Sequence, residues 1–180
     1  MRKDWRACAE KNNLNPYHAP QGGYSKTYAL IIKTSGAILK NEWSVGGYRS
    51  WCREVLPQIA IINAKKMAGG AHIDPFAMQQ YYKNDADLLK DQIAGINPDI
   101  IINTNHSPEL LKHLNVQNPR QEVSCALINP ARKGSFYSYR QKDTGRIILE
   151  VQHTNTRCLT HGEYIKLVQL CLAKQGFQFT

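Results

Sequence analysis

Two short segments of the chain combine residue types that suit the binding of a nucleobase. In the first, Asn63 closes an apolar run and is followed by Lys65 and Lys66. A carboxamide both donates and accepts hydrogen bonds, so it can pair with the edge of a base, and lysines can neutralise a phosphate. The competing interpretation is that Asn63 is an ordinary turn residue, which is the commoner role of an Asn after a strand.

The second segment contains His153, Asn155 and Arg157 and follows another apolar run. An imidazole can donate a hydrogen bond to an oxygen that gains negative charge during a reaction. The amide and the guanidinium add further hydrogen-bond donors. Together the two segments predict a nucleobase-binding site.

Alternating strands and helices must position these residues. Short apolar runs bounded by Pro or Asn predict buried strands at 58–63, 99–103 and 122–128. Continuous apolar runs are typical of central parallel strands. Asp74-Pro75 predicts the start of one helix, and a second helix, after a cap at Asp85, is expected to follow. In open α/β sheets, ligands bind beyond the carboxyl ends of the strands, where Asn63 and His153 would lie.

The second half of the chain predicts a hairpin between two helices. Ser107-Pro108 can open a helix, and the segments 135–141 and 146–152 flank turn residues that include Asp143 and Gly145. Thr160 is expected to cap a last helix that ends at Gly176. Tyr164, Val168, Cys171 and Leu172 are expected to line one face of that helix.

The whole chain, residues 1–180, is therefore expected to form a single α/β domain, with residues 1–24 as a basic arm or loop. Residues 25–39 leave two possibilities open. They fit either an apolar helix or a strand at 28–33 followed by a turn, and periodicity does not choose between them.

The charge of the chain favours a polyanionic partner. The 180 residues carry 23 Lys and Arg against 14 Asp and Glu, a net charge of +9. The excess lies at the two ends, with +7 in residues 1–66 and +5 in residues 119–180, against −3 between them. A positive surface attracts nucleic acid through counterion release, and DNA is the expected partner. The alternative is a generic basic surface that serves solubility.

Several classes of protein are not expected. No apolar run approaches the roughly 20 residues that span a bilayer, and residues 1–6 are not followed by the apolar stretch of a secretory signal. The chain is therefore expected to be cytoplasmic. Its five cysteines are dispersed, which predicts reduced thiols, no disulfide framework, no metal site and no cofactor.

The order of these parts resembles the uracil-DNA glycosylase superfamily. Residues 59–63 look like the family's strand that ends in a base-reading Asn, and residues 98–102 look like the central strand that follows. Residues 151–155 are similar to its His loop, and residues 13–20 are similar to its first motif. The resemblance implies a three-layer α/β/α sandwich with a short, mostly parallel sheet.

The resemblance also implies roles for individual residues. Asn63 would read an extruded pyrimidine, Tyr28 would stack on it and His153 would donate to the base as the glycosidic bond breaks. Asn15 stands where the family has a catalytic Asp and would position the water through its amide. That amide lacks the basicity by which general-base catalysis contributes about 100- to 10,000-fold. The remaining implied substrate-binding residues are Tyr17, Lys65, Lys66, Asn155 and Arg157.

Three functions are therefore compared. The first is a DNA glycosylase-like protein that binds a flipped pyrimidine and hydrolyses its N-glycosidic bond. The second is a non-catalytic protein that binds nucleic acid or a nucleotide on the same fold. The third is a partner-binding protein whose positive charge only steers association.

Overall fold

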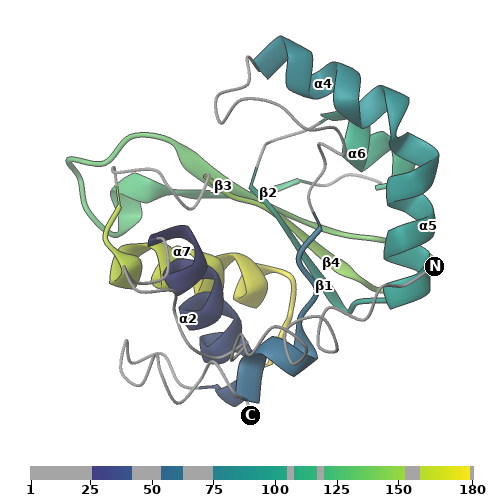
Figure 1. Cartoon of the computed structure of the whole chain (residues 1–180). Coiled ribbons are helices and arrows are strands. Elements are labelled where there is room, and N and C mark those ends of the chain that lie inside the picture. The colour runs from purple at the N-terminus through teal and green to yellow at the C-terminus, as the bar shows by residue number, and fades with distance from the viewer. Residues whose placement is uncertain are drawn as a thin grey trace. The chain divides into compact units, whose positions relative to one another are not determined.

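The computed structural model describes residues 26–41, 54–62, 75–104, 108–116, 120–152 and 159–178. The chain divides into two compact units, Met1–Ile59 and Ala60–Thr180. The second unit contains a four-stranded mixed sheet with helices, so the α/β class is confirmed (Figure 1).

The described part of the first unit is helical. Helix α2 spans Lys26–Lys40, and a short 3₁₀ helix, η1, spans Leu56–Gln58. Ile32 of α2 is 2% exposed and belongs to the same small core as Val55, which is 0% exposed. Burial of an apolar face against Val55 stabilises a helix over residues 26–40, which decides between the two possibilities that the sequence leaves open.

The sheet of the second unit has the order β1-β4-β3-β2. Its strands are β1 (Ile100–Asn103), β2 (Gln121–Ser124), β3 (Ser135–Arg140) and β4 (Ile147–Glu150). β1 and β4 pair in parallel, whereas β4 with β3 and β3 with β2 pair antiparallel. The expectation of a mostly parallel sheet is wrong for these strands, because β3 and β4 form a tight hairpin and a tight hairpin joins antiparallel strands only.

The strand expected at 58–63 is also wrong over its described residues. Gln58 ends η1, and residues 59–62 have no regular secondary structure, with Ile61 52% exposed. Pro57 lies in the first turn of η1, where its fixed φ fits a helix and its missing N–H is not needed. The expected strand end, Asn63, lies outside the described residues.

The strand expected at 122–128 is shorter than its apolar run. β2 ends at Ser124, whose hydroxyl accepts a hydrogen bond from the backbone N–H of Ala126 over 3.3 Å. This local bond begins a second 3₁₀ helix, η2 (Cys125–Leu127). Leu127 is 68% exposed, so the apolar run continues past the core.

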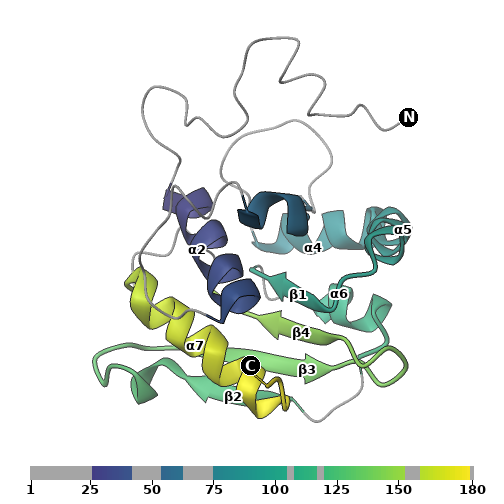
Figure 2. The ribbon, with the colours of Figure 1, turned by 90° about the horizontal axis from the view of Figure 1, so that it is seen from below.

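Helices cover both faces of the sheet (Figure 2). Helix α7, His161–Lys174, contacts β2, β3 and β4 on one face, where the rings of Phe136 and Tyr164 meet edge to face at 5.1 Å. The other face carries Tyr139 and Ile148, which share a core with residues of three further helices. The alternation of side chains along β3 and β4 separates the two cores.

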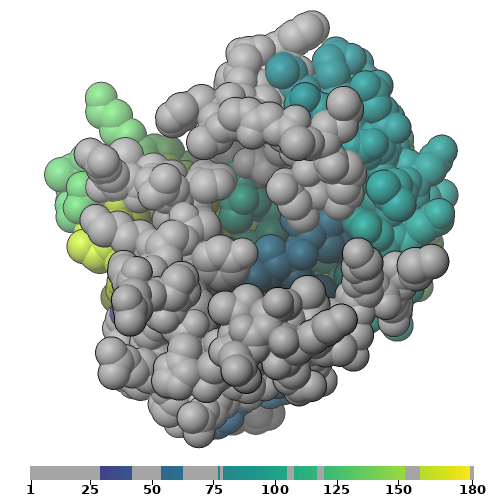
Figure 3. Space-filling model, viewed as in Figure 1, coloured from purple at the N-terminus to yellow at the C-terminus, as the bar shows by residue number. Residues whose placement is uncertain are grey.

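The three further helices are α4 (Pro75–Asn84), α5 (Ala86–Ile96) and α6 (Pro108–His113). The starts of α4 at Pro75 and of α5 after Asp85 confirm the predicted helix starts, although the Asp85 side chain makes no capping hydrogen bond. Their buried residues in the shared core are Tyr82, Leu89, Ile93 and Leu110, and Leu114, just after α6, joins them. Residues of α4 and α5, drawn in teal, form part of the molecular surface in Figure 3.

Helix α7 begins with a complete capping box. The Thr160 hydroxyl accepts from the backbone N–H of Glu163, and the Glu163 carboxylate accepts from the backbone N–H of Thr160. The four residues expected on its inner face, Tyr164, Val168, Cys171 and Leu172, are all buried. The predicted cap and face of this helix are confirmed.

Candidate functional site

The carboxyl ends of β1 and β4 lie side by side. Because these strands run parallel, Asn103 at the end of β1 is the register partner of Glu150 at the end of β4. The backbone N–H of Val151 donates to the carbonyl of Asn103 over 2.9 Å, which holds the two strand ends together. This is the edge of an α/β sheet at which ligands bind.

Glu150 is a carboxylate buried at that edge, with 6% of its surface exposed. Its Oε2 accepts a hydrogen bond of 3.0 Å from the hydroxyl of Tyr139, and its Oε1 is buried with no hydrogen-bond partner among the described residues. Burial of the phenol, and secondarily the charge of Glu150, raises the pKa of Tyr139 well above its ordinary value. Tyr139 therefore remains a hydrogen-bond donor to the carboxylate across the physiological pH range.

Asn103 provides an amide beside this carboxylate. It is 5% exposed, and its Oδ1 accepts a hydrogen bond of 3.3 Å from the hydroxyl of Tyr82 on α4. Alternation along the paired strands places Asn103 and Glu150 on the same face of the sheet. Helix α4 and strand β3 thus orient the two polar side chains through one tyrosine each.

A cation borders the same group of residues. The guanidinium of Arg120 lies 4.4 Å from the centre of the Tyr137 ring, and Tyr137 is the register partner of Glu150. The positive charge of Arg120 partly counteracts the rise in the pKa of Tyr139. Carboxylate, amide, phenol and guanidinium groups therefore converge near one strand end, a combination that can bind a polar ligand and move a proton.

Gln152 anchors the chain just after β4. Its backbone carbonyl accepts a hydrogen bond of 3.2 Å from the Tyr164 hydroxyl, and its Nε2 donates to the Lys133 carbonyl over 3.4 Å. Gly134 allows this approach, because a Cβ there would lie 2.6 Å from Gln152 Nε2 and its backbone φ is +95°. The segment 153–158 therefore starts from a residue that is held to the 125–134 loop.

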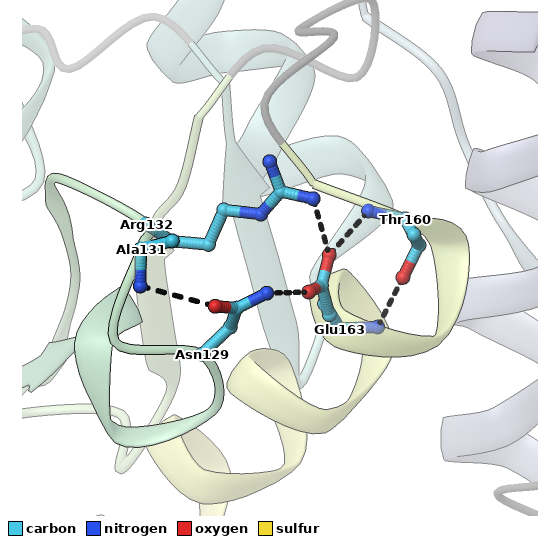
Figure 4. A network of polar contacts seen from close by, with 5 residues as sticks. All are labelled: Asn129, Ala131, Arg132, Thr160 and Glu163. Atoms are coloured by element: carbon cyan, nitrogen blue, oxygen red, sulfur yellow. Dashed lines mark hydrogen bonds and ion pairs between the residues drawn. The ribbon is translucent and has the colours of Figure 1, made fainter.

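A network around Glu163 anchors the chain where residues 153–158 end and α7 begins (Figure 4). Besides its bond to Thr160, the Glu163 carboxylate accepts a hydrogen bond of 3.0 Å from the Asn129 amide and lies 3.5 Å from Nη2 of Arg132. The hydrogen bond from the Thr160 backbone, followed by the one from Asn129, lowers the pKa of Glu163 to about 2. Glu163 is thus ionised at neutral pH and joins the 125–134 loop to α7.

Eight of the site residues predicted from the sequence lie outside the described residues. They are Asn15, Tyr17, Asn63, Lys65, Lys66, His153, Asn155 and Arg157. Tyr28 belongs to α2 in the first unit, and its side chain is likewise outside the description.

Glu150, Tyr139 and Asn103 are not among the site residues predicted from the sequence. A signal was present for Glu150, because it is an acidic residue inside the otherwise apolar run from 147 to 151. A charge in a buried strand is costly and is retained at functional or paired positions. Asn103 likewise ends an apolar run, as Asn63 does, whereas nothing local distinguishes Tyr139 from a packing residue.

The residues that the structure describes contain no group of three or more His, Cys, Asp or Glu placed to hold a metal ion. Among the same residues, no helix is long and apolar enough to cross a membrane. Comparisons of the chain with protein-family models, with curated proteins and with solved structures find no match.

Proposed function

We propose that the protein binds a pyrimidine extruded from DNA and hydrolyses its N-glycosidic bond, on a sandwich fold like that of the uracil-DNA glycosylases. The observation that carries the proposal is the carboxylate of Glu150 at the carboxyl end of β4. One oxygen is held by Tyr139, and the other has no partner among the described residues. His153 follows Glu150 closely in the chain.

Glu150 supplies the base that Asn15 lacks. In the proposed reaction a water oxygen bonds to C1′ of the sugar while the C1′–N1 bond breaks and its electron pair leaves with the base. Glu150 Oε1 accepts the proton of the water, and the hydrogen bond from Tyr139 fixes the orientation of the carboxylate. His153 donates a hydrogen bond to the oxygen of the departing base, which later takes a proton from solvent.

The remaining predicted residues bind the substrate in this proposal. Asn63 pairs with the edge of the base, and Tyr28 stacks on its face. The charge of +9 holds the DNA backbone and makes the affinity fall as salt is raised. Anchoring at Gln152 and Glu163 supports the proposal, because these residues fix the chain on both sides of the segment that carries His153.

A non-catalytic nucleic-acid-binding protein is the second candidate. Two observations favour it. Asn15 replaces the carboxylate of the family's first motif, and residues 59–62 lack the strand that precedes the base-reading Asn in that family. A protein of this kind would bind single-stranded or distorted DNA without releasing a base.

The test is a base-release assay with uracil-containing single- and double-stranded oligonucleotides. Abasic sites are converted to strand breaks by alkali and counted after single-turnover incubation with excess protein. We expect wild-type protein to release uracil and Glu150→Gln to be slower by about 100-fold or more. The matched control is Glu109→Gln on α6, which removes a partly buried carboxylate that is paired with the exposed Lys112 and should retain the wild-type rate.

The outcomes separate the candidates. Absence of base release by wild-type protein, with DNA binding retained, would contradict the hydrolase and support the binding protein. Wild-type release with an equally active Glu150→Gln variant would show that another group acts as the base. Both variants are first checked by urea unfolding, so that loss of activity is not loss of fold.

A further inference from the structure

A surface depression of about 450 Å³ lies at the opposite edge of the β1–β4 pair from Glu150. It is lined by residues at the amino ends of these strands, by the β3–β4 turn and by the chain that follows α7. Charged groups on this lining are Arg140, Arg146 and Asp99. Its volume falls in the lower part of the range for small-molecule sites, about 300–1,000 Å³.

Arg146 is a buried cation, with 8% of its surface exposed. Its guanidinium donates to the carbonyl of Pro98 over 2.7 Å, to Asn97 Oδ1 over 3.1 Å and to Gln141 Oε1 over 3.3 Å. All three acceptors are uncharged, and Arg146 makes no ion pair with any described carboxylate. Three of the five N–H groups of the guanidinium thereby donate to neutral acceptors, and none of these bonds neutralises its charge.

Arg140 provides a second guanidinium on the same lining. It donates to the carbonyl of Gly145 over 2.9 Å and to the carbonyl of Gln175, so its head group is held from two sides. It too makes no ion pair within the described part of the chain. Two oriented arginines that form no ion pair with a described carboxylate, against the single carboxylate of Asp99, give the described lining of the depression a net positive charge.

A buried cation that lacks a counter-charge is costly unless a ligand supplies one. Guanidinium groups match the geometry of phosphate oxygens, and hydrogen bonds to a charged group are stronger than neutral ones. The depression also has an apolar part, made by Pro98, Ile100, Ile147 and Phe177, which suits a sugar or a base. From this combination we infer that the depression binds the phosphate of a nucleotide, either free or at the end of a DNA strand.

This inference does not depend on the proposed base hydrolysis. The depression lies at the amino ends of β1 and β4, whereas Glu150 and Asn103 lie at their carboxyl ends. The rate of base release depends only on groups at the carboxyl ends of β1 and β4. The binding experiment therefore measures nucleotide affinity by calorimetry without any reaction, and failure of one proposal leaves the other standing.

The ligands are deoxyuridine 5′-monophosphate, deoxyuridine, inorganic phosphate, and an oligonucleotide with and without a 5′-phosphate, all at low ionic strength. We expect the monophosphate to bind at least tenfold more tightly than deoxyuridine. Tighter binding of the 5′-phosphorylated oligonucleotide than of the monophosphate would assign the site to DNA ends, and the reverse order would assign it to free nucleotides. Equal affinity for deoxyuridine and its monophosphate would overturn the inference.

Three variants locate the site. Arg140→Gln removes one exposed guanidinium and should weaken binding of the monophosphate about tenfold. Asp99→Asn removes the only carboxylate on the lining and should strengthen binding about threefold. The matched control is Lys142→Gln in the β3–β4 turn, which loses the same charge outside the depression and should change the affinity by less than about twofold.

Equal losses in Arg140→Gln and Lys142→Gln would show a general effect of charge and would refute the site. A second readout is the amide chemical shift of Gly145 and Gly176, which both line the depression. Ligand-dependent shifts should include these two residues in wild-type protein. Binding that leaves both amides unshifted would also refute the assignment.

Discussion

The hydroxyl of Tyr139 donates a hydrogen bond of 3.0 Å to Oε2 of Glu150, across the antiparallel pair of β3 and β4. Both residues are 6% exposed. The bond satisfies one oxygen of a carboxylate whose other oxygen, Oε1, has no hydrogen-bond partner among the described residues. It links the stability of the domain to the group on which the proposed chemistry depends.

Replacement of Tyr139 by Phe should therefore lower the stability of the folded protein. It leaves a buried carboxylate without its donor, and we expect the free energy of unfolding in urea to fall by about 2–3 kcal/mol. The matched control is Tyr164→Phe, which removes a bond to the neutral carbonyl of Gln152 and should cost about 1 kcal/mol. Equal losses in the two variants would contradict a charged acceptor at Glu150.

Gly134 should tolerate no side chain, in contrast to another glycine of the same unit. Gly134→Ala forces a Cβ at φ +95° and to within 2.6 Å of Gln152 Nε2, so we expect a destabilisation of about 1–3 kcal/mol. Gly95→Ala lies within α5, where nothing is within 4 Å of the added Cβ, and should stabilise by about 0.5–1 kcal/mol. Thermal unfolding of both variants checks the opposite signs.

Ionisation of Glu163 should make the free energy of unfolding decrease as the pH falls into the acid range. Its pKa is lowered from the ordinary value of 4.5 to about 2 in the folded protein, so the folded state binds fewer protons than the unfolded chain between these two pH values. The stabilisation is complete above about pH 5 and is lost as the pH falls through 4.5 towards 2. Urea unfolding of wild-type protein and Glu163→Gln should show a stability difference that shrinks over this window. A difference independent of pH would rule out this role.

Cys171 should be unreactive in the folded protein. It is fully buried, and burial raises the pKa of its thiol to about 12, so the reactive thiolate is scarce at neutral pH. We expect iodoacetamide at pH 8 to modify Cys171 only after unfolding in urea, as measured by mass spectrometry of its peptide. Rapid labelling without urea would show that α7 opens readily from the sheet.

Local patterns in the sequence determined most of the helices and the hairpin. Pro75 begins α4, α5 begins after Asp85 at the predicted position, and the capping box of Thr160 and Glu163 begins α7. The turn before Arg146 joins β3 to β4. These features depend on residues close together in the chain, so short-range physical chemistry is sufficient to locate them.

Strand pairing and the polar groups at the sheet edge were decided only by the tertiary structure. The apolar run at 58–62 has the composition of a strand, yet a strand exists only where a neighbour supplies hydrogen bonds. In the same way, Asn103 meets Glu150 because two distant strands pair in parallel. Such contacts between distant residues form on folding and leave no spacing in the sequence that would reveal them.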